Sequence, residues 1–257
     1  MRLAIARLLA AVHRGVTRVN RLPLAIAGGL LTPRDRQAWQ QRQWNADADC
    51  YAEAERVGFG LTRWEREIFD RWFPGSGRVV VAGCGAGREM IALAEMGYEV
   101  SGFDLISAAV KHANQNLVER GVPGRVVTAD AADYPFDGGP YAGIFFSWYV
   151  YSYVCPRAQR IVVLNRLRNA LRDDGCVALV LASPRGPRRG PTLRVAQAVA
   201  RFTRNPVLPE EGDWLDPGLQ WIHVTTREEM EQEARDAGLK LVEWVPDPRT
   251  VALLERA

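Results

Sequence analysis

The sequence has few lysines and no acidic residue near its start. Lys111 and Lys240 are the only lysines among 257 residues, so almost all of the positive charge is arginine, and the net charge is +3. So small a net charge does not by itself indicate nucleic-acid binding, and we expect no nucleic-acid partner. The composition, with 47% hydrophobic and 25% charged residues, is that of an ordinary globular chain.

Cysteine is also sparse, and no two cysteines form a CxxC pair. Cys50, Cys84, Cys155 and Cys176 lie far apart in the chain. This spacing argues against a zinc site and a disulfide framework, and it favours a reducing compartment. We therefore expect no metal site and a cytoplasmic protein.

Long hydrophobic runs are absent as well. No stretch reaches the roughly 18 uninterrupted apolar residues of a membrane-spanning helix. Arg7 interrupts the apolar run that a secretory signal would need. No Asp or Glu precedes Asp35, and an acid-free start rich in arginine also fits a mitochondrial transit peptide if the source is eukaryotic.

Residues 1–31 are predicted to contain a basic amphipathic helix that ends at Pro23. At about 100° per residue, arginines fall on one side of this helix and apolar residues on the other. The arginines are Arg7, Arg14, Arg18 and Arg21, and the apolar residues are Ile5, Leu8, Leu9, Val12, Val16 and Val19. Two interpretations follow: residues 1–22 contact a membrane surface peripherally, or the apolar side packs on the rest of the protein.

Residues 32–75 are predicted to form a helical, aromatic-rich cap, and residues 76–257 a separate domain. In that domain, apolar runs typical of buried strands alternate with helical stretches. The predicted strands are 78–82, 98–103, 125–128, 144–146 and 176–181, and the predicted helices are 88–96, 107–120 and 157–171. Such alternation predicts an α/β, Rossmann-like, doubly wound and mostly parallel sheet with helices on both faces.

The segment VVVAGCGAGREM, residues 79–90, predicts a strand, a glycine-rich turn and a helix. Gly83, Gly85 and Gly87 remove side chains where backbone approaches a ligand, and the helix N-terminus offers free N–H groups. Asp104 ends the next strand, 21 positions after Gly83 (104 − 83). A carboxylate there can accept both hydroxyls of a ribose.

Arg88 narrows the choice of cofactor. The dinucleotide fingerprint GxGxxG needs a small residue at position 88 for close helix packing, and this chain has arginine there. The turn reads GxGxG instead, which suits a cofactor with a ribose and no pyrophosphate. A nicotinamide-dependent oxidoreductase is therefore the weaker alternative.

Four stretches carry a family resemblance: AGCGAGREMIALAEMGYEVSGFDLISAAV, TADAADYPF, LRDDGCVALVLASP and TTREEMEQEARDAGLKLVEWV. Together they resemble the class I S-adenosylmethionine-dependent methyltransferases from about Arg78 to the C-terminus. The resemblance implies a seven-stranded sheet whose last strand is antiparallel, with 239–245 and 250–254 as the final hairpin. It implies S-adenosylmethionine as the cofactor and a small molecule as the methyl acceptor, with an anionic or lipid-like acceptor as one option.

The same resemblance assigns the cofactor contacts. The glycine loop would line the methionine part, Asp104 would hold the ribose hydroxyls, and Leu105 would lie against the adenine. The third strand tip would meet the adenine edge, and the fourth would face the methionine and the methyl group. The implied residues are Gly83, Cys84, Gly85, Ala86, Gly87, Asp104, Leu105, Asp130, Ala131, Phe146 and Ser147.

Val81 departs from the pattern of many members, which have an acid there that helps to hold the cofactor's amino group. The thiopurine methyltransferase-like branch is similar to this chain in having an apolar residue at that position. Glu89, in the first turn of the next helix, is a candidate substitute, although an exposed helix N-terminal glutamate is the simpler interpretation. Val81 also favours the alternative of a non-catalytic partner or scaffold protein, which the three glycines and Asp104 oppose.

His223 is the candidate general base, because imidazole titrates near neutrality and the segment before TTREE borders the active site in similar enzymes. A histidine that only shapes the acceptor site is the alternative.

The arginine-rich segment from about 183 to 219 is expected to be an inserted lid that attracts an anionic acceptor or lipid headgroups, or else a solvated loop. The aromatic run SWYVYSYV, residues 147–154, predicts an acceptor wall or core packing.

Overall fold

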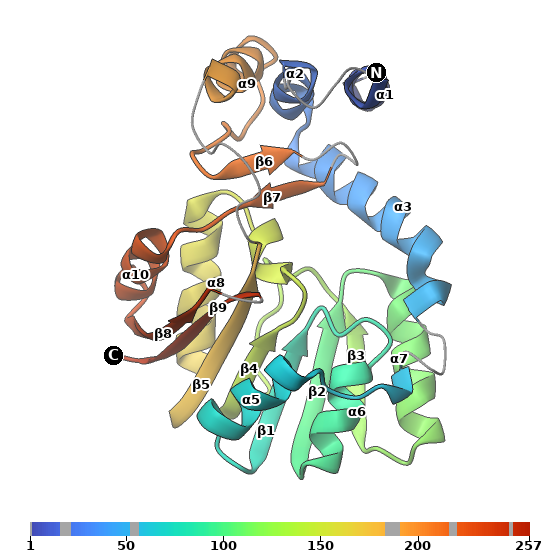
Figure 1. The fold of residues 1–257 in the computed structure, drawn as a ribbon, viewed down its shortest axis with the longest axis vertical. Helices are drawn as coiled ribbons and strands as arrows, with labels where there is room; N and C mark the ends of the chain where they lie inside the picture. The colour runs from blue at the N-terminus through green and yellow to red at the C-terminus, as the bar shows by residue number, and fades with distance from the viewer. Residues whose placement is uncertain (1, 16–21, 52–56, 183–190, 216–219, 247–248) are drawn as a thin grey trace. The chain divides into compact units, whose positions relative to one another are not determined.

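The computed structural model describes residues 2–15, 22–51, 57–182, 191–215, 220–246 and 249–257. The chain divides into two compact units, each built from two stretches of sequence (Figure 1). The first unit combines Met1–Gln43 with Ala182–Thr226, and the second combines Trp44–Leu181 with Arg227–Ala257.

A seven-stranded sheet forms the centre of the second unit. Its strands are β1 (Gly77–Ala82), β2 (Tyr98–Asp104), β3 (Gly124–Thr128), β4 (Tyr141–Phe146), β5 (Leu171–Leu181), β8 (Leu239–Val245) and β9 (Thr250–Arg256). Their order is β3-β2-β1-β4-β5-β9-β8. Neighbours from β3 to β5 are parallel, whereas β9 is antiparallel to both β5 and β8. The predicted mostly parallel sheet with an antiparallel last strand is confirmed.

Helices cover both faces of this sheet, as the alternation along β1 requires. The helices are α5 (Arg63–Trp72), α6 (Arg88–Glu95), α7 (Ser107–Glu119), α8 (Arg157–Ala170) and α10 (Arg227–Asp236), with a 3₁₀ turn η1 (Val150–Tyr153). Val79 and Val81 belong to a core with α5, α6 and α7, and Val80 and Ala82 belong to a second core with α8 and α10. The predicted doubly wound architecture is therefore confirmed.

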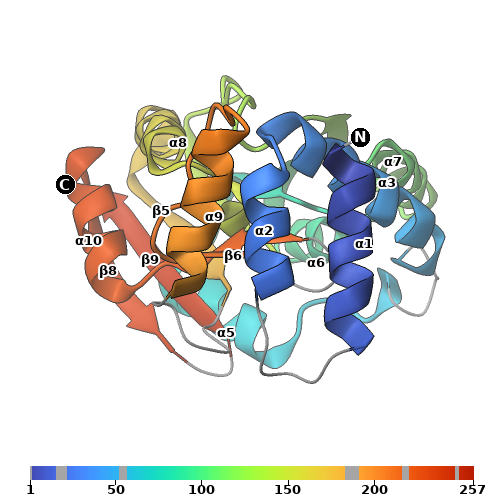
Figure 2. The same cartoon turned by 90° about the horizontal axis from the view of Figure 1, so that it is seen from above.

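Three helices pack side by side in the first unit, beside a small sheet (Figure 2). The elements are α1 (Arg2–Gly15), α2 (Leu22–Leu30), α9 (Pro191–Phe202), β6 (Asp213–Leu215) and β7 (Trp221–His223), together with α3 (Pro33–Tyr51) as far as Gln43. α2 lies so close to α9 that a Cβ on Gly29 would stand 2.3 Å from the Ala196 carbonyl oxygen. Part of the expected lid thus forms one unit with the N-terminal helices, while 183–190 and 216–219 lie outside the described residues.

The N-terminal helix can be compared with its prediction only in part. α1 is described as far as Gly15, and 16–21 lie outside the described residues, whereas Pro23 lies in the first turn of α2, where a proline needs no N–H partner. Arg7 lies partly buried with its guanidinium 4.3 Å from the Trp39 ring centre, whereas Ile5 and Leu8 are 41% and 65% exposed. Of the predicted apolar side, Ile5 and Leu8 are thus exposed and Leu9 is partly buried, while Val16 and Val19 lie outside the described residues.

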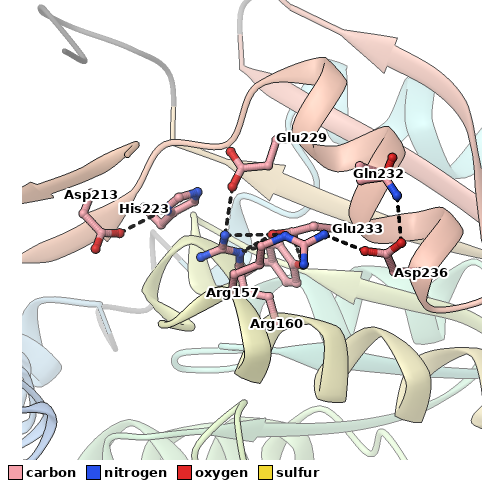
Figure 3. Close-up of polar contacts among 9 residues, drawn as sticks. Arg157, Arg160, Asp213, His223, Glu229, Gln232, Glu233 and Asp236 are labelled. Atoms are coloured by element: carbon pink, nitrogen blue, oxygen red, sulfur yellow. Dashed lines mark hydrogen bonds and ion pairs between the residues drawn. The ribbon is translucent and has the colours of Figure 1, made fainter. Parts of the chain in front are cut away.

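A buried ion pair joins α8 to α10 in the second unit (Figure 3). The Arg160 and Glu233 side chains are both fully buried, with Nη2 and Oε1 2.7 Å apart. Arg160 also pairs with Glu229 at 2.9 Å, and the Tyr151 hydroxyl donates to Glu233 at 3.0 Å. Nearby, Arg157 pairs with Asp236 at 2.6 Å in a half-exposed position. The helix pair is thus held by one buried and one solvated arginine.

Candidate active site

The glycine loop connects β1 to α6 and bonds to the end of β2. The N–H groups of Gly83 and Cys84 donate to the Phe103 carbonyl at 2.8 Å and 3.2 Å. Gly83 has φ of 69°, and a Cβ on it would stand 2.1 Å from a Val150 methyl. Gly85 has φ of 53°, but a Cβ there would meet nothing within 4 Å. Backbone therefore faces open space at Gly85, where a ligand can approach it.

Asp104 fixes this loop from the tip of β2. Its two carboxylate oxygens accept the N–H groups of Gly85 and Ile106, each at 2.9 Å. Burial raises the pKa of the Asp104 carboxyl, and the two backbone bonds oppose that rise. Each oxygen keeps a further lone pair, so the carboxylate can accept two hydroxyl groups in addition.

The predicted residues of the neighbouring strand tips also gather here. The Asp104 carbonyl accepts the Ala129 N–H at 3.0 Å, which draws the β3 tip to the β2 tip. Asp130 closes its own turn by accepting the Ala132 N–H at 2.8 Å, and the adjacent Ala131 is buried. Leu105 packs partly buried against Ile106 and its neighbours. At the tips of β2 and β3, an acidic residue is therefore followed by an apolar one.

Phe146 and Ser147 end β4 beside the same loop. The Ser147 N–H donates to the Ala82 carbonyl at 3.1 Å, so the tips of β4 and β1 are joined. Trp148 and Tyr149 follow with positive φ of 41° and 68°. Left-handed backbone is costly for aromatic residues and clusters at functional sites. The Arg249 guanidinium lies 4.8 Å from the Trp148 ring centre and bonds the Tyr149 hydroxyl, so this aromatic turn is held in place.

Glu89 is buried, and the expectation of an exposed helix N-terminal glutamate is wrong. Its Oε1 accepts the Ser147 hydroxyl at 2.9 Å and contacts Arg88 Nη2 at 2.6 Å. Arg88 in turn donates to both oxygens of the fully buried Glu65, at 2.8 Å and 2.7 Å. Sequence reasoning missed Glu65, because its place in a capping box with Thr62 already explains a glutamate there.

His223 is paired with an acid that sequence reasoning also missed. The His223 Nδ1 and Asp213 Oδ1 atoms lie 2.8 Å apart on the paired strands β7 and β6, and both side chains are almost fully buried (Figure 3). A carboxylate at this nitrogen orients the ring. The pair belongs to the first unit, whereas the glycine loop belongs to the second.

The residues around the glycine loop fit S-adenosylmethionine. The open space at Gly85 can accommodate the amino-acid part of the cofactor. The Asp104 carboxylate can accept hydrogen bonds from the ribose hydroxyls, and the Asp130 carboxylate can accept one from the exocyclic amine of adenine. Cys84 is buried, and its burial together with the Asp104 and Glu89 charges raises the pKa of its thiol, so it stays neutral. Within the described part of the chain, no group of three or more His, Cys, Asp or Glu side chains could hold a metal ion.

Comparison with known proteins agrees with this geometry. A family model described as a methyltransferase domain matches residues 79–175. A curated relative, the S-adenosyl-L-methionine-dependent Diels-Alderase iliD of Neonectria sp. (strain DH2), is 33% identical over 79 residues, which are 30% of this chain and 32% of the relative. The chain thus spans about a third of the length of that curated relative.

Solved structures show the same fold over most of the chain. The Burkholderia thailandensis 1,6-didemethyltoxoflavin-N1-methyltransferase matches with a TM-score of 0.63 and 17% identity, over 88% of this chain and 91% of that one. The CcbJ methyltransferase of Streptomyces caelestis matches with a TM-score of 0.59 and 16% identity, over 82% of this chain and 96% of that one. Residues 79–175 therefore match a methyltransferase domain, in a chain whose seven-stranded sheet has the fold of these two methyltransferases.

Proposed function

We propose that this protein transfers a methyl group from S-adenosylmethionine to a small-molecule acceptor. The observation that carries the proposal is the buried Asp104 carboxylate, held by the N–H groups of Gly85 and Ile106 beside the open face of the glycine loop. In this arrangement the Asp104 carboxylate can still accept hydrogen bonds from a ribose, and the loop backbone at Gly85 can contact the amino-acid part of the cofactor. The acceptor class is proposed as small because Trp148 and Tyr149 supply an aromatic wall suited to a flat or apolar molecule.

The bound cofactor supplies an electrophilic methyl group on a sulfonium sulfur. An acceptor oxygen, nitrogen, sulfur or carbon would receive that methyl group. Asp104 and the loop hold the donor in position, and the buried Phe146 excludes water from the β4 tip. The protein's main contribution under this mechanism is alignment and desolvation of the two reactants.

We assign His223 the role of general base, supported by Asp213. The Asp213 carboxylate contacts Nδ1 and orients the imidazole that would take the proton of a protonated acceptor. A base is needed only when the acceptor carries a proton at working pH, as a phenol or an ammonium group does. The role is therefore specific to the acceptor and not to cofactor binding.

The test combines product detection with a substitution. The protein is incubated with S-adenosylmethionine and a panel of phenols, amines and thiols, and S-adenosylhomocysteine and methylated products are measured by mass spectrometry. On the best acceptor, His223→Asn is expected to lower kcat by about a hundredfold or more, and Asp213→Asn by less, with unchanged S-adenosylhomocysteine binding. Equal turnover by wild type and His223→Asn would remove His223 from the mechanism.

An inactive protein would be informative as well. The curated relative is named as a Diels-Alderase, a class of reaction that forms a ring without transferring a methyl group. If the protein binds the cofactor but releases no S-adenosylhomocysteine with any acceptor, methyl transfer is the wrong reaction. A cofactor-dependent rearrangement or a scaffold role would then replace it.

We also propose that the layer of α1, α2 and α9 contacts an anionic membrane surface, which would suit a lipid-like acceptor. The sequence of these three helices contains no Asp or Glu. The exposed apolar side chains are Ile5, Leu8, Leu22 and Phe202, the last of them 91% exposed. Exposed arginines, Arg194 and Arg201, flank them on α9. Apolar and cationic groups without acids are typical of interfacial membrane contacts. No helix among the described residues is long and apolar enough to cross a bilayer.

Vesicle co-sedimentation tests this contact. Wild type is expected to sediment with vesicles of phosphatidylglycerol and phosphatidylcholine but not with phosphatidylcholine alone. The double variant Leu8→Ser/Phe202→Ser is expected to lose most of this binding, because two apolar insertions are removed. Val118→Ser is the matched control, since Val118 is 80% exposed on α7 and lies outside the three helices. Unchanged sedimentation of the double variant would exclude the layer as the contact.

A further inference from the structure

Three ionisable side chains form a buried cluster with an excess of negative charge. Arg88 lies between Glu65 and Glu89, and the exposed fractions of the three side chains are 16%, 0% and 5%. One cation therefore faces two carboxylates. Among the residues that the structure describes, neither glutamate has a second cationic partner.

Arg88 is committed mainly to Glu65. It donates to both carboxylate oxygens of Glu65 and also bonds the Gly60 carbonyl at 2.5 Å, whereas it reaches only Oε1 of Glu89. A bidentate pair is the stronger geometry, so Arg88 compensates the charge of Glu65 more fully than that of Glu89. The side-chain hydrogen bonds from Arg88 and Ser147 both go to Oε1 of Glu89.

A buried carboxylate in this state is stable only if a cation joins it or a proton neutralises it. Burial raises the pKa of the Glu89 carboxyl, and the Arg88 charge opposes that rise. Keeping the Glu89 carboxylate both charged and buried therefore costs free energy. A ligand that brings its own cation and hydrogen-bond donors would remove that cost.

The location of Glu89 identifies such a ligand. Its carboxylate bonds the Ser147 hydroxyl at the junction of the β1 and β4 tips, and its charge acts on the Cys84 thiol of the glycine loop. Val81, which lies on the same side of β1 as α6, is buried among apolar residues and cannot bind a cation. The amino-acid part of the cofactor meets this loop, and its ammonium group needs an acceptor there.

We infer that Glu89, held by Ser147 and Arg88, binds the α-ammonium group of the cofactor and takes the place of the acid that β1 lacks. The inference rests on the cofactor assignment above and goes beyond it, because it predicts which part of the cofactor depends on this side chain. Glu65 contributes indirectly, since it holds Arg88 and so leaves the Glu89 charge available to the ligand.

Calorimetry with three ligands tests the inference. S-adenosylhomocysteine carries the ammonium group, its analogue with hydrogen in place of the amino group lacks only that group, and 5′-methylthioadenosine lacks the whole amino-acid part. Glu89→Gln is expected to weaken S-adenosylhomocysteine binding by about tenfold to a hundredfold, the usual range for one hydrogen bond to a charged group. The same variant is expected to bind the other two ligands within about threefold of wild type, because they present no cation to position 89.

The controls separate a lost contact from a damaged site. Glu95→Gln removes one charge from the exposed end of the same helix and is expected to leave all three affinities unchanged. Unaltered 5′-methylthioadenosine binding by Glu89→Gln shows that the site is still folded. Equal weakening of all three ligands would overturn the inference and make Glu89 a structural support of the loop. No weakening of S-adenosylhomocysteine would overturn it too, whereas failure of wild type to bind any of the three would instead refute the cofactor assignment.

Discussion

Asp104→Ala is expected to abolish measurable binding of S-adenosylhomocysteine and S-adenosylmethionine. Two effects add: the ribose loses hydrogen bonds to a charged group, each worth about 1.5–3 kcal/mol, and the N–H groups of Gly85 and Ile106 lose their acceptor. A loss of about 3 kcal/mol or more corresponds to over a hundredfold in Kd. Unlike Glu89→Gln, the substitution is expected to weaken 5′-methylthioadenosine as well, since that ligand keeps the ribose.

Isothermal calorimetry measures this loss, and thermal unfolding shows whether the variant still folds. Asp137→Ala is a suitable control, because it removes an exposed acid from the loop before β4. We expect its affinity to equal that of wild type. If Asp104→Ala bound the cofactor within a few fold of wild type, the ribose would have to lie elsewhere, and the assignment of the whole glycine loop would fall with it.

Arg160→Ala is expected to have the largest effect on stability, a loss of about 3–5 kcal/mol in the free energy of unfolding. The substitution leaves the Glu233 carboxylate fully buried, with the Tyr151 hydroxyl at 3.0 Å and the half-exposed Arg157 no closer than 3.8 Å. Burial and the Glu233 charge raise the pKa of the Tyr151 hydroxyl, so that group stays neutral and cannot compensate the carboxylate.

Arg157→Ala provides the comparison on the same helix. Its side chain is 41% exposed and its partner Asp236 36% exposed, so we expect a loss of less than about 1 kcal/mol. Urea unfolding followed by fluorescence and circular dichroism measures both variants. The double variant Arg160→Met/Glu233→Leu is expected to recover much of the loss, because no charge remains to be buried. Similar midpoints for Arg160→Ala and Arg157→Ala would show that the buried pair contributes no more than a surface one.

Local pattern was sufficient to predict the sheet and the glycine loop. Apolar strands alternate with amphipathic helices several times along the sequence, with glycines near their ends. The loop from Gly83 to Gly87 lies between one such strand and the helix that follows it. The start of β5 was missed: the strand begins at Leu171 and not near Cys176, because Leu171 pairs with Tyr141 across an irregular register. Polar residues at 172–174 concealed that pairing.

Contacts between distant residues could not be predicted in the same way. The burial of Glu89 depends on Ser147, 58 positions later, and on Glu65, which binds Arg88 from 23 positions earlier. His223 and Asp213 are ten positions apart, but only the pairing of β6 with β7 brings them together. The placement of α1 involves contacts with distant residues, among them that of Arg7 with Trp39 and that of Arg2 with the Thr203 carbonyl. Each depends on tertiary packing, which periodicity does not encode.

The division of the chain into interleaved units has a practical consequence for shortened forms of the protein. Removing residues 1–43 would not delete a domain, because its other half, 182–226, would remain within the chain. The remaining α9 would lose Gly29 and the rest of α2 from its packed side, and the Asn205 amide would lose its acceptors at Gly29 and Leu31. Misfolding, proteolysis and aggregation would follow whether or not the N-terminal helices bind lipid. Loss of membrane binding or activity in such a truncation therefore carries no information about anchoring, and only point substitutions at exposed positions can provide it.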